Sequence, residues 1–489
     1  MRKVFLVNLV KECDLPLGLA SIATYLRENV GKDVDIKILD SNYVSPIAEI
    51  KKAKPDIVGI SAMTVYFHEA KQLAAEIRKL YPNMLIVVGG VHISTHKISF
   101  DKCFDIAVIG EGEKTFAFLV KKYFESNNFF SKEDLNKIKG IMFWDGEKKV
   151  ETEPMELIAN LDELPIPDRS FFDKRYFGRG VNRLVDGKFV RAGTIMTGRG
   201  CPFKCMFCST SLFWKKVRFF SPKRIADEVE YLYETYGIEV ISIWDDLFGV
   251  TKKRVLEIIN EFKKRDFFGK VVFITMFKAD LVDDEMCVLL KELGVRGLNF
   301  GFESGSQKVL SYLKKDKLKV EEIKNAIVTC RKHGIKVFGS LMLGSPGETL
   351  EDMKKTIELI DFMKENDVEG AWVFVTSPFP GTELWNYGVE KGLLNDNFDF
   401  EYSSHYNTMR PIFLEKNIPL IEFQKIFDIA KNKLSAFSRD SWKNRIKRAV
   451  LDPVEFVKKV YNLIFIYSAF PMFLKRFKEK IRRKNYLFK

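Results

Sequence analysis

Two stretches of the chain alternate short apolar runs with amphipathic segments. In the first stretch, residues 1–126, five apolar runs predict β-strands, and three segments with a helical pattern separate or follow them. The strands are expected at Lys3–Leu9, Val34–Leu39, Asp56–Ser61, Leu85–Gly89 and Ile106–Ile109, and the helices at Gly18–Asn29, His68–Leu80 and Gly112–Ser126. Because the strands are apolar along nearly their whole length, the pattern predicts an α/β fold with a doubly wound parallel sheet covered on both faces.

The second stretch, residues 191–376, repeats this alternation six times. Ser221 and Asp283 stand where helices are expected to begin, and Gly294 and Gly334 where helices are expected to end. The six strands are expected at Ala192–Thr197, Glu239–Trp244, Val271–Met276, Gly297–Phe302, Lys336–Leu343 and Gly370–Thr376. The six helices are expected at Pro222–Tyr236, Lys252–Arg265, Asp284–Leu293, Ser306–Leu313, Val320–His333 and Thr349–Asn366. Functional residues of such sheets lie at the carboxyl ends of the strands.

The segments outside these two stretches have a different pattern. Residues 127–190 are expected to be a connector, since Pro165 and Pro167 disfavour a helix there. The C-terminal part is expected to be mainly helical and contains one amphipathic stretch, Leu420–Phe437. We therefore expect five parts, which are residues 1–126, 127–190, 191–390, 391–440 and 441–489.

Basic residues are concentrated in the last of these parts. The whole chain has a formal net charge of +13, but residues 441–489 alone hold 14 basic and 3 acidic residues, so the body is almost neutral. The apolar run Val460–Leu474 is about 15 residues long, shorter than the ~20 residues of a membrane span. Basic clusters beside aromatic residues favour a tail on an anionic membrane surface. A helix packed on the protein body and a segment that binds RNA are the alternatives.

Three cysteines form the most distinctive motif of the chain. Cys201, Cys205 and Cys208 have C-x3-C-x2-C spacing and follow a predicted strand through Thr197-Gly198-Arg199-Gly200. Three thiolates on one loop can hold three irons of a cubane cluster and leave the fourth iron open. Zinc is the competing metal, but a structural zinc site needs a fourth ligand that the neighbouring sequence does not supply.

The other cysteines of the chain indicate its redox environment. Four further cysteines are scattered singly, at Cys13, Cys103, Cys287 and Cys330. This arrangement disfavours a second cysteine-ligated cluster. An odd total of seven without a secretory signal favours a reducing cytoplasm over disulfide bonding.

The cysteine spacing resembles that of the radical S-adenosylmethionine (SAM) enzymes, and Phe207 before the last cysteine matches the usual residue of that family. The resemblance implies a partial (β/α)6 barrel and a [4Fe-4S] cluster. The open iron of the cluster would bind SAM, and electron transfer would cleave SAM to a 5′-deoxyadenosyl radical. It also implies an external reductant of the ferredoxin or flavodoxin type and sensitivity to oxygen. Residues 391–440 would cap the barrel mouth, and His405 or Tyr406 there is a candidate proton acceptor.

Three strand ends carry residues that the same resemblance assigns to SAM. Asp245 and Asp246 would meet its amino group, although helix capping is the alternative role for both. Glu303 and Ser304 would contact the ribose, and Gly344 and Pro346 the adenosyl group. Glu348, in the same loop, is either a further contact or a charge at a helix start.

The strand ends of the first stretch resemble those of the cobalamin-binding domain that precedes many radical SAM domains. The residues assigned to cobalamin are Leu17, Gly18, Ser61, Met63, Thr64, Gly89, Gly90, His92, Gly110, Glu111 and Gly112. No Asp-x-His-x-x-Gly follows the first strand, so the usual histidine ligand of cobalt is missing. His68, His92 and His96 are each better explained as ordinary surface or hydrogen-bonded histidines than as cobalt ligands. A domain that has lost cobalamin is the alternative, while the absence of G-x-G-x-x-G disfavours a dinucleotide.

The resemblance leads to a functional expectation. We expect a cytoplasmic enzyme, at the inner face of the membrane through its tail, that methylates an unactivated carbon of a lipid or isoprenoid-like substrate. Ring formation, carbon–carbon coupling or oxidation with the same cofactors are alternatives. A tRNA-modifying enzyme is a third, disfavoured because the body is almost neutral and has no separate basic β-barrel domain.

Overall fold

The computed structural model describes residues 2–11, 15–31, 33–185, 187–395, 411–416 and 418–435. All of these residues belong to the first of the two units into which the chain divides, Met1–Phe437. The basic tail and the candidate proton acceptors His405 and Tyr406 lie outside the described residues. Among the helices of the described ranges, none is both long enough and apolar enough to cross a membrane.

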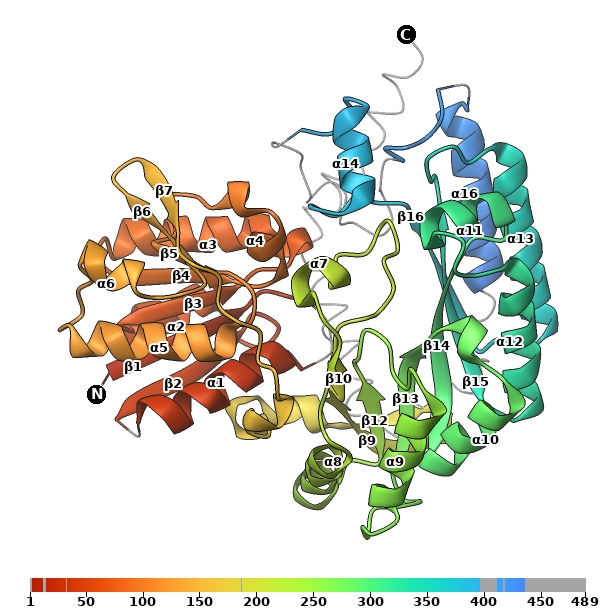
Figure 1. Cartoon of the computed structure of the whole chain (residues 1–489), viewed down its shortest axis with the longest axis horizontal. Helices are drawn as coiled ribbons and strands as arrows, with labels where there is room; N and C mark the ends of the chain where they lie inside the picture. The colour runs from red at the N-terminus through yellow and green to blue at the C-terminus, as the bar shows by residue number, and fades with distance from the viewer. Residues whose placement is uncertain are drawn as a thin grey trace, which may run out of the picture. The chain divides into compact units, whose positions relative to one another are not determined.

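The first stretch forms the predicted doubly wound sheet (Figure 1). Its strands lie in the order β2 (Val34–Asp40), β1 (Arg2–Asn8), β3 (Ile57–Ser61), β4 (Leu85–Gly89), β5 (Ile106–Val108), β6 (Ile141–Asp145) and β7 (Lys148–Glu151). Strands β1 to β5 are parallel, as the pattern predicts. The hairpin β6–β7 adds two antiparallel strands to the edge of β5, where Val108 pairs with Ile141. This hairpin comes from the segment expected to be a connector.

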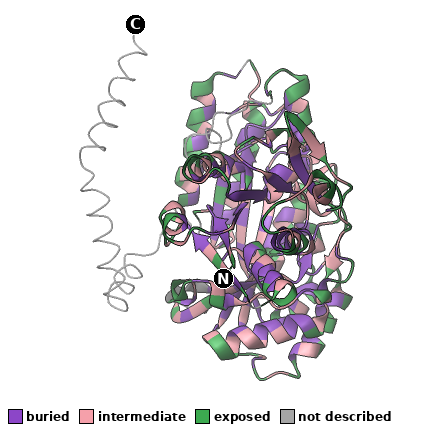
Figure 2. Cartoon of the chain, turned by 90° about the vertical axis from the view of Figure 1, so that its left-hand side faces the viewer, coloured by how far each residue is buried: buried purple, intermediate pink, exposed green. Residues whose placement is uncertain are grey.

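Side chains on alternate positions of β1 enter two different cores. Val4 and Leu6 pack with helices α1 (Leu17–Val30) and α5 (Gly112–Glu125). Phe5 and Val7 pack on the other face with α2 (Pro46–Ala53) and α3 (Phe67–Leu80). Figure 2 shows these strands mostly buried and the helices with one exposed side. Short helices α4 (Val91–Thr95) and α6 (Lys132–Asn136) complete this part of the chain.

The second stretch forms a parallel sheet of six strands with one antiparallel edge strand. The order is β16 (Gly370–Val375), β15 (Lys336–Leu343), β14 (Val295–Glu303), β13 (Val272–Phe277), β12 (Val240–Ile243), β9 (Lys188–Ile195) and β8 (Arg179–Asn182). This curled sheet confirms the predicted partial barrel, and each of the six expected strands is present. A small ribbon of β10 (Gly198–Arg199) and β11 (Arg218–Phe219) follows β9.

Among the described residues, helices cover one face of the second sheet, and none covers the opposite face, which we call the open face (Figure 1). These helices are α8 (Pro222–Tyr236), α9 (Lys252–Phe262), α10 (Asp284–Leu293), α11 (Gln307–Lys314), α12 (Val320–Lys332), α13 (Leu350–Glu365) and α16 (Leu420–Ser435). Two further helices, α7 (Thr210–Trp214) and α14 (Glu383–Glu390), lie outside this layer. On β16, Ala371, Val373 and Val375 pack into the core beneath the helices. Because side chains of a strand alternate between faces, Trp372 and Phe374 lie on the opposite, open face.

Two neighbouring residues join the connector to the two sheets' helices: Asp168 contacts a helix of the first sheet, and Arg169 contacts a helix of the second. Asp168 forms an ion pair of 2.7 Å with Arg27 of α1. Arg169, whose side chain is 1% exposed, donates to Glu228 of α8 at 2.6 Å and to the Thr194 carbonyl at 2.8 Å. A buried guanidinium with two acceptors is costly to disrupt. This segment therefore fixes the connector against both α/β parts.

Replacing Gly305 with alanine is expected to destabilise the second sheet. A Cβ at Gly305 would lie 2.2 Å from the Lys355 carbonyl oxygen, so α13 or the loop after β14 would have to shift. Overpacking of this kind costs roughly 1–3 kcal/mol, and the thermal unfolding midpoint should fall. Gly18→Ala is the matched control, because a Cβ at Gly18 would point into open space. Equal midpoints for Gly305→Ala and the wild type would contradict this packing.

Candidate cofactor site

The three cysteines lie on one short loop between β10 and α7. The Cys208 amide donates to the Cys205 carbonyl at 3.1 Å, and the Met206 amide donates to the Leu313 carbonyl at 3.0 Å. All three cysteines are free and half-buried. Burial raises the pKa of Cys201 to about 11, and the neighbouring Cys208 and Cys205 add to this effect. The thiols are thus close enough to interact, and a bound cation would favour their ionisation.

The loop geometry suits a cluster. Within the described ranges, no three His, Cys, Asp or Glu side chains converge as the ligands of a single ion do. Cysteines that ligate a cubane need not converge, because each binds a different iron. Three free, partly exposed thiols on one loop therefore fit a [4Fe-4S] cluster.

Two lysines flank this loop: Lys314 is the last residue of α11, and Lys278 directly follows β13. Lys314 lies 5.2 Å from the ring centre of Phe207, and Lys278 lies 4.4 Å from that of Phe203. Burial raises the pKa of Cys205, and the two ammonium groups partly oppose that rise. The lysines therefore favour the thiolate form that binds iron.

Two consecutive carboxylates after β12 hold the backbone around the cysteines. Asp245 is buried and accepts from the amides of Thr197 at 2.6 Å and Gly198 at 3.1 Å, and also from the Thr197 hydroxyl. Burial raises its pKa to about 7. Asp246 accepts from the Gly200 amide at 3.0 Å and the Thr210 hydroxyl at 2.9 Å. The pair braces the loop on both sides of the cysteines.

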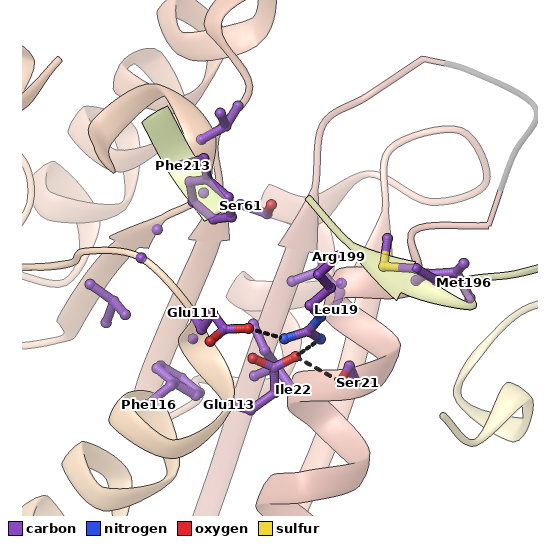
Figure 3. A pocket seen from close by; sticks show the side chains of 18 of the residues that line it. Leu19, Ser21, Ile22, Ser61, Glu111, Glu113, Phe116, Met196, Arg199 and Phe213 are labelled. Carbon is purple, nitrogen blue, oxygen red and sulfur yellow. Dashed lines mark hydrogen bonds and ion pairs between the residues drawn. The ribbon is translucent and has the colours of Figure 1, made fainter. Parts of the chain in front are cut away.

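A cavity of about 480 Å³ lies where the strand ends of the first sheet meet this loop (Figure 3). Nine of the residues expected to contact cobalamin line it: Leu17, Gly18, Ser61, Met63, Gly89, Gly90, Gly110, Glu111 and Gly112. The second α/β part of the chain contributes residues that follow β9 and β12, namely Met196, Arg199, Ser209, Thr210, Phe213, Trp214 and Asp246. One cavity therefore has walls from both parts of the chain.

The cavity also extends beneath the strand ends of the first sheet. This apolar arm runs between the sheet and helices α1 and α5, and is lined by Leu6, Ile22, Gly59, Val87, Val108 and Phe116. At its mouth, Gly90 has φ +105°, and a Cβ there would lie 2.7 Å from the Ala62 carbonyl oxygen. Only glycine allows this close packing of two strand-end loops. A large, mostly apolar cavity with a few polar groups fits a corrin.

Comparison with known proteins identifies the family. Residues 195–360 match the radical SAM superfamily, and residues 4–120 match the B12 binding domain. The chain is 34% identical to the uncharacterized methyltransferase PH0819 of Pyrococcus horikoshii over 388 residues, which are 78% of this chain and 79% of that protein. The chain belongs to the radical SAM superfamily. As a radical SAM enzyme with a B12 binding domain, it uses a [4Fe-4S] cluster, SAM and cobalamin.

Two further comparisons describe the range of similar proteins. The anaerobic magnesium-protoporphyrin IX monomethyl ester cyclase of Cereibacter sphaeroides is 29% identical over 386 residues, 77% of this chain and 60% of the cyclase. The structure of TsrM, a radical SAM methyltransferase from Kitasatospora setae with cobalamin and a [4Fe-4S] cluster bound, gives a TM-score of 0.65 at 19% identity, covering 80% of this chain and 78% of TsrM. The likeness to TsrM is one of fold.

The residues expected to bind SAM have different surroundings. Asp246 lines the cavity, whereas the Asp245 carboxylate accepts hydrogen bonds from the backbone before the cysteines, such as that from the Thr197 amide. Glu303 pairs with Lys314 at 2.9 Å, beside the cysteine loop. Ser304 is fully buried, and its hydroxyl faces Thr356 of α13 at 3.2 Å. The structure therefore brings Asp246 and Glu303 to the cluster loop, but directs Asp245 and Ser304 into the protein.

The loop after β15 is braced by its own glutamate. Glu348 accepts from the amides of Gly344 at 2.6 Å and Ser345 at 2.9 Å, which fixes the turn that contains Pro346. Burial raises the pKa of Glu348 to about 7, and its second oxygen has no hydrogen-bond partner among the residues that the structure describes. Its role in the described structure is thus to shape the loop.

Two of the residues expected to contact cobalamin do not line the cavity. His92 is fully buried, and its ring nitrogens lie 3.3 Å from the Thr64 hydroxyl and 3.1 Å from the Ser99 hydroxyl. Burial lowers the pKa of His92 to about 3. His92 and Thr64 therefore bond to each other inside the first part of the chain. None of the described residues lining the cavity is a histidine, in line with the missing motif.

The sequence did not single out several residues of the cavity wall. Arg199, Glu113, Phe213 and Trp214 all line it. Arg199 precedes the cysteines by two residues, and Glu113 ends the Gly110-Glu111-Gly112-Glu113 loop, so each adjoins a recognised motif. The signal available in the sequence was a charged residue of each sign beside the two loops expected to bind cofactors.

Each of the cysteines of the loop is expected to be essential for the cluster. After anaerobic reconstitution with iron and sulfide, Cys201→Ala, Cys205→Ala and Cys208→Ala should each lose most of the iron and the charge-transfer absorption, because each thiolate holds one iron. Cys103→Ala is the matched control, since Cys103 is also half-buried but belongs to the first sheet's core. Full iron content in any of the three loop variants would contradict the assignment.

Proposed function

We propose that this enzyme is a cobalamin-dependent methyltransferase that methylates an unactivated carbon of a hydrophobic, lipid or isoprenoid-like substrate. The observation that carries the proposal is the shared wall of the cavity. Glu111 and Gly112 of the corrin loop face Met196, Arg199 and Trp214, which flank the cysteine loop. A methyl donor and a radical source that act on one carbon need such neighbouring sites.

The protein's own residues position the reactants and exclude water. When bound, the cluster, SAM and cobalamin supply the radical and the methyl group. Asp245 and Asp246 hold the cysteine loop, and Lys314 with Glu303 forms a buried ion pair beside it. The apolar lining of the cavity would surround part of a bound corrin and limit its contact with water, which protects reactive species from side reactions.

The open face of the second sheet supports a hydrophobic substrate. Trp372 is 53% exposed, Met276 is 41% exposed, and Trp244, at the end of β12, is 48% exposed. Large apolar side chains at the open face favour an apolar or aromatic partner over a strongly charged one. The basic tail supports the same proposal, because 14 basic residues against 3 acidic ones suit an anionic membrane surface where lipids are available.

Ring formation with the same cofactors is the second candidate. The observation that favours it is the similarity to the Cereibacter sphaeroides cyclase. The chain matches 79% of the Pyrococcus horikoshii relative at 34% identity, but only 60% of the cyclase at 29% identity. Because the Pyrococcus horikoshii relative is described as a methyltransferase, this comparison favours methylation.

The reaction products distinguish the two candidates. The enzyme, reconstituted anaerobically with iron, sulfide and cobalamin, is incubated with SAM, a reductant and total lipid extract. Methylation predicts 5′-deoxyadenosine together with S-adenosylhomocysteine and a product heavier by one methylene group, because one SAM supplies the radical and another the methyl group. Deoxyadenosine without S-adenosylhomocysteine would reject methylation and favour the second candidate.

Trp372 tests the hydrophobic substrate. Trp372→Ala removes a large exposed ring from the open face and should lower product formation about tenfold, the equivalent of 1.4 kcal/mol of lost contact. Iron and cobalamin contents should not change. Phe129→Ala, which removes another exposed ring beyond α5 (71% exposed), is the control. Unchanged product formation in Trp372→Ala would count against a substrate at the open face.

A further inference from the structure

Four charged residues join the corrin loop to the cysteine loop. Arg199 donates to Glu111 and to Glu113, at 2.5 Å each (Figure 3). Arg218 donates to the second oxygen of Glu111 at 2.8 Å. We call Glu111, Glu113, Arg199 and Arg218 the bridge cluster. It contains two charges of each sign, and every ion pair in it crosses from the first α/β part to the second.

The bridge cluster is buried and strongly constrained. The four side chains are between 5% and 9% exposed. Further bonds fix the carboxylates: Glu113 accepts from the Ser21 hydroxyl at 2.8 Å, and Glu111 from the Ile158 amide at 2.9 Å. Removing one partner of such a pair leaves an uncompensated buried charge, which is strongly destabilising. Moving one loop away from the other would therefore break these buried ion pairs.

The two ends of the bridge cluster adjoin the two cofactor sites. Glu111 and Glu113 flank Gly112 where the loop after β5 passes into α5, and all three residues line the corrin cavity. Arg199 lies in β10, two residues before Cys201, and its neighbouring Gly200 amide is held by Asp246. Trp214, after the cysteine loop, lies over both guanidinium groups at 5.1 and 5.9 Å and lines the same cavity. An occupant of the cavity thus touches both ends of the cluster.

We propose that Arg199 is a positioning residue that couples cobalamin occupancy to SAM binding at the cluster. A corrin in the cavity restricts the loop of Glu111 and Glu113. Through Arg199 this restriction is passed to the backbone before Cys201, so the cluster loop loses less freedom when SAM binds. Cobalamin therefore tightens SAM binding, and by linkage SAM tightens cobalamin binding by the same factor.

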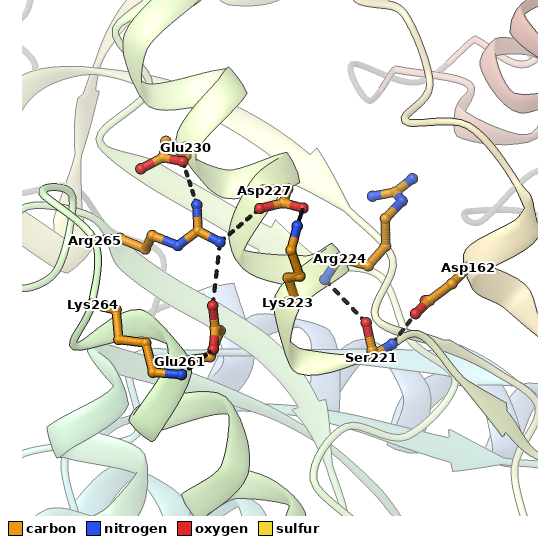
Figure 4. A network of polar contacts seen from close by, with 9 residues as sticks. All are labelled: Asp162, Ser221, Lys223, Arg224, Asp227, Glu230, Glu261, Lys264 and Arg265. Carbon is orange, nitrogen blue, oxygen red and sulfur yellow. Dashed lines mark hydrogen bonds and ion pairs between the residues drawn. The ribbon is translucent and has the colours of Figure 1, made fainter.

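Arg265 offers a matched control. It also joins several carboxylates, at 2.6 Å to Glu230, 2.7 Å to Asp227 and 3.2 Å to Glu261 (Figure 4). These partners belong to α8 and α9, on the helix-covered side of the second sheet. Arg265→Lys therefore weakens a comparable network that does not connect the two cofactor sites.

The test measures binding rather than turnover. Protein reconstituted with iron and sulfide, with and without hydroxocobalamin, is titrated with SAM, and the SAM-induced change in the EPR spectrum of the reduced cluster gives the dissociation constant. We expect cobalamin to tighten SAM binding about fivefold or more in the wild type and in Arg265→Lys. In Arg199→Lys the effect should fall below twofold, because a lysine cannot bridge two carboxylates as the planar guanidinium does.

The ratio of the SAM dissociation constants without and with cobalamin decides the test. A wild-type value of this ratio in Arg199→Lys would overturn the proposal. A wild-type enzyme whose SAM affinity does not change with cobalamin would also overturn it. If Arg199→Lys loses its cluster, Glu113→Gln decides instead. Glu113→Gln keeps the Arg199–Glu111 pair and an acceptor for Ser21, and should at least halve the ratio while iron content is retained. An unchanged ratio in that variant would equally overturn the proposal. A purely structural role predicts weaker binding of both ligands with the ratio intact.

Discussion

Arg199 meets Glu111 and Glu113 between the two α/β parts, and the rest of the site depends on this buried contact. The strand ends of the first sheet supply the glycines and apolar residues of a corrin cavity, while the loop after β10 supplies three thiols. A corrin cavity and a cysteine loop could each exist without the other. The guanidinium, bonded to both carboxylates at 2.5 Å, makes them two walls of one cavity. Burial makes this contact expensive to break, which gives the walls a defined relative position.

Two buried carboxylates near the cysteines accept hydrogen bonds from backbone amides and so fix the shape of the strand-end loops. Asp245 braces Thr197 and Gly198, Glu348 braces Gly344 and Ser345, and each of these carboxylates has a pKa raised by burial to about 7. Loop geometry of this kind fixes backbone atoms before any ligand binds. The organisation is one in which the cofactors carry the chemistry and the chain supplies preorganised supports.

Local patterns explain what the sequence predicted well. The bounds of β15, α8 and α10 coincide with their predicted bounds, because apolar periodicity and caps such as Ser221 and Asp283 are local signals. The cysteine triad is equally local. The hairpin β6–β7 was missed because its strands are short and β7 has no buried residue.

Long-range contacts explain the remaining differences. Arg199 and Glu111 are 88 residues apart, and no periodicity reveals that they will meet. Asp245 and Asp246 have the same chemistry and adjacent positions, yet only Asp246 lines the cavity. His92 likewise follows a strand end, but its ring turns inward to Thr64 and Ser99. Residue type and strand-end position predicted the site's location, whereas side-chain direction depended on packing.

The central claim is that one cavity brings the corrin next to the cysteine loop, and magnetic coupling between the two cofactors tests it most directly. Protein holding both cob(II)alamin and the reduced [4Fe-4S] cluster is examined by EPR, beside samples that hold only one of them. The account predicts that each signal is broadened and relaxes faster when the other cofactor is present. Two signals that match the single-cofactor samples in shape and relaxation would contradict it.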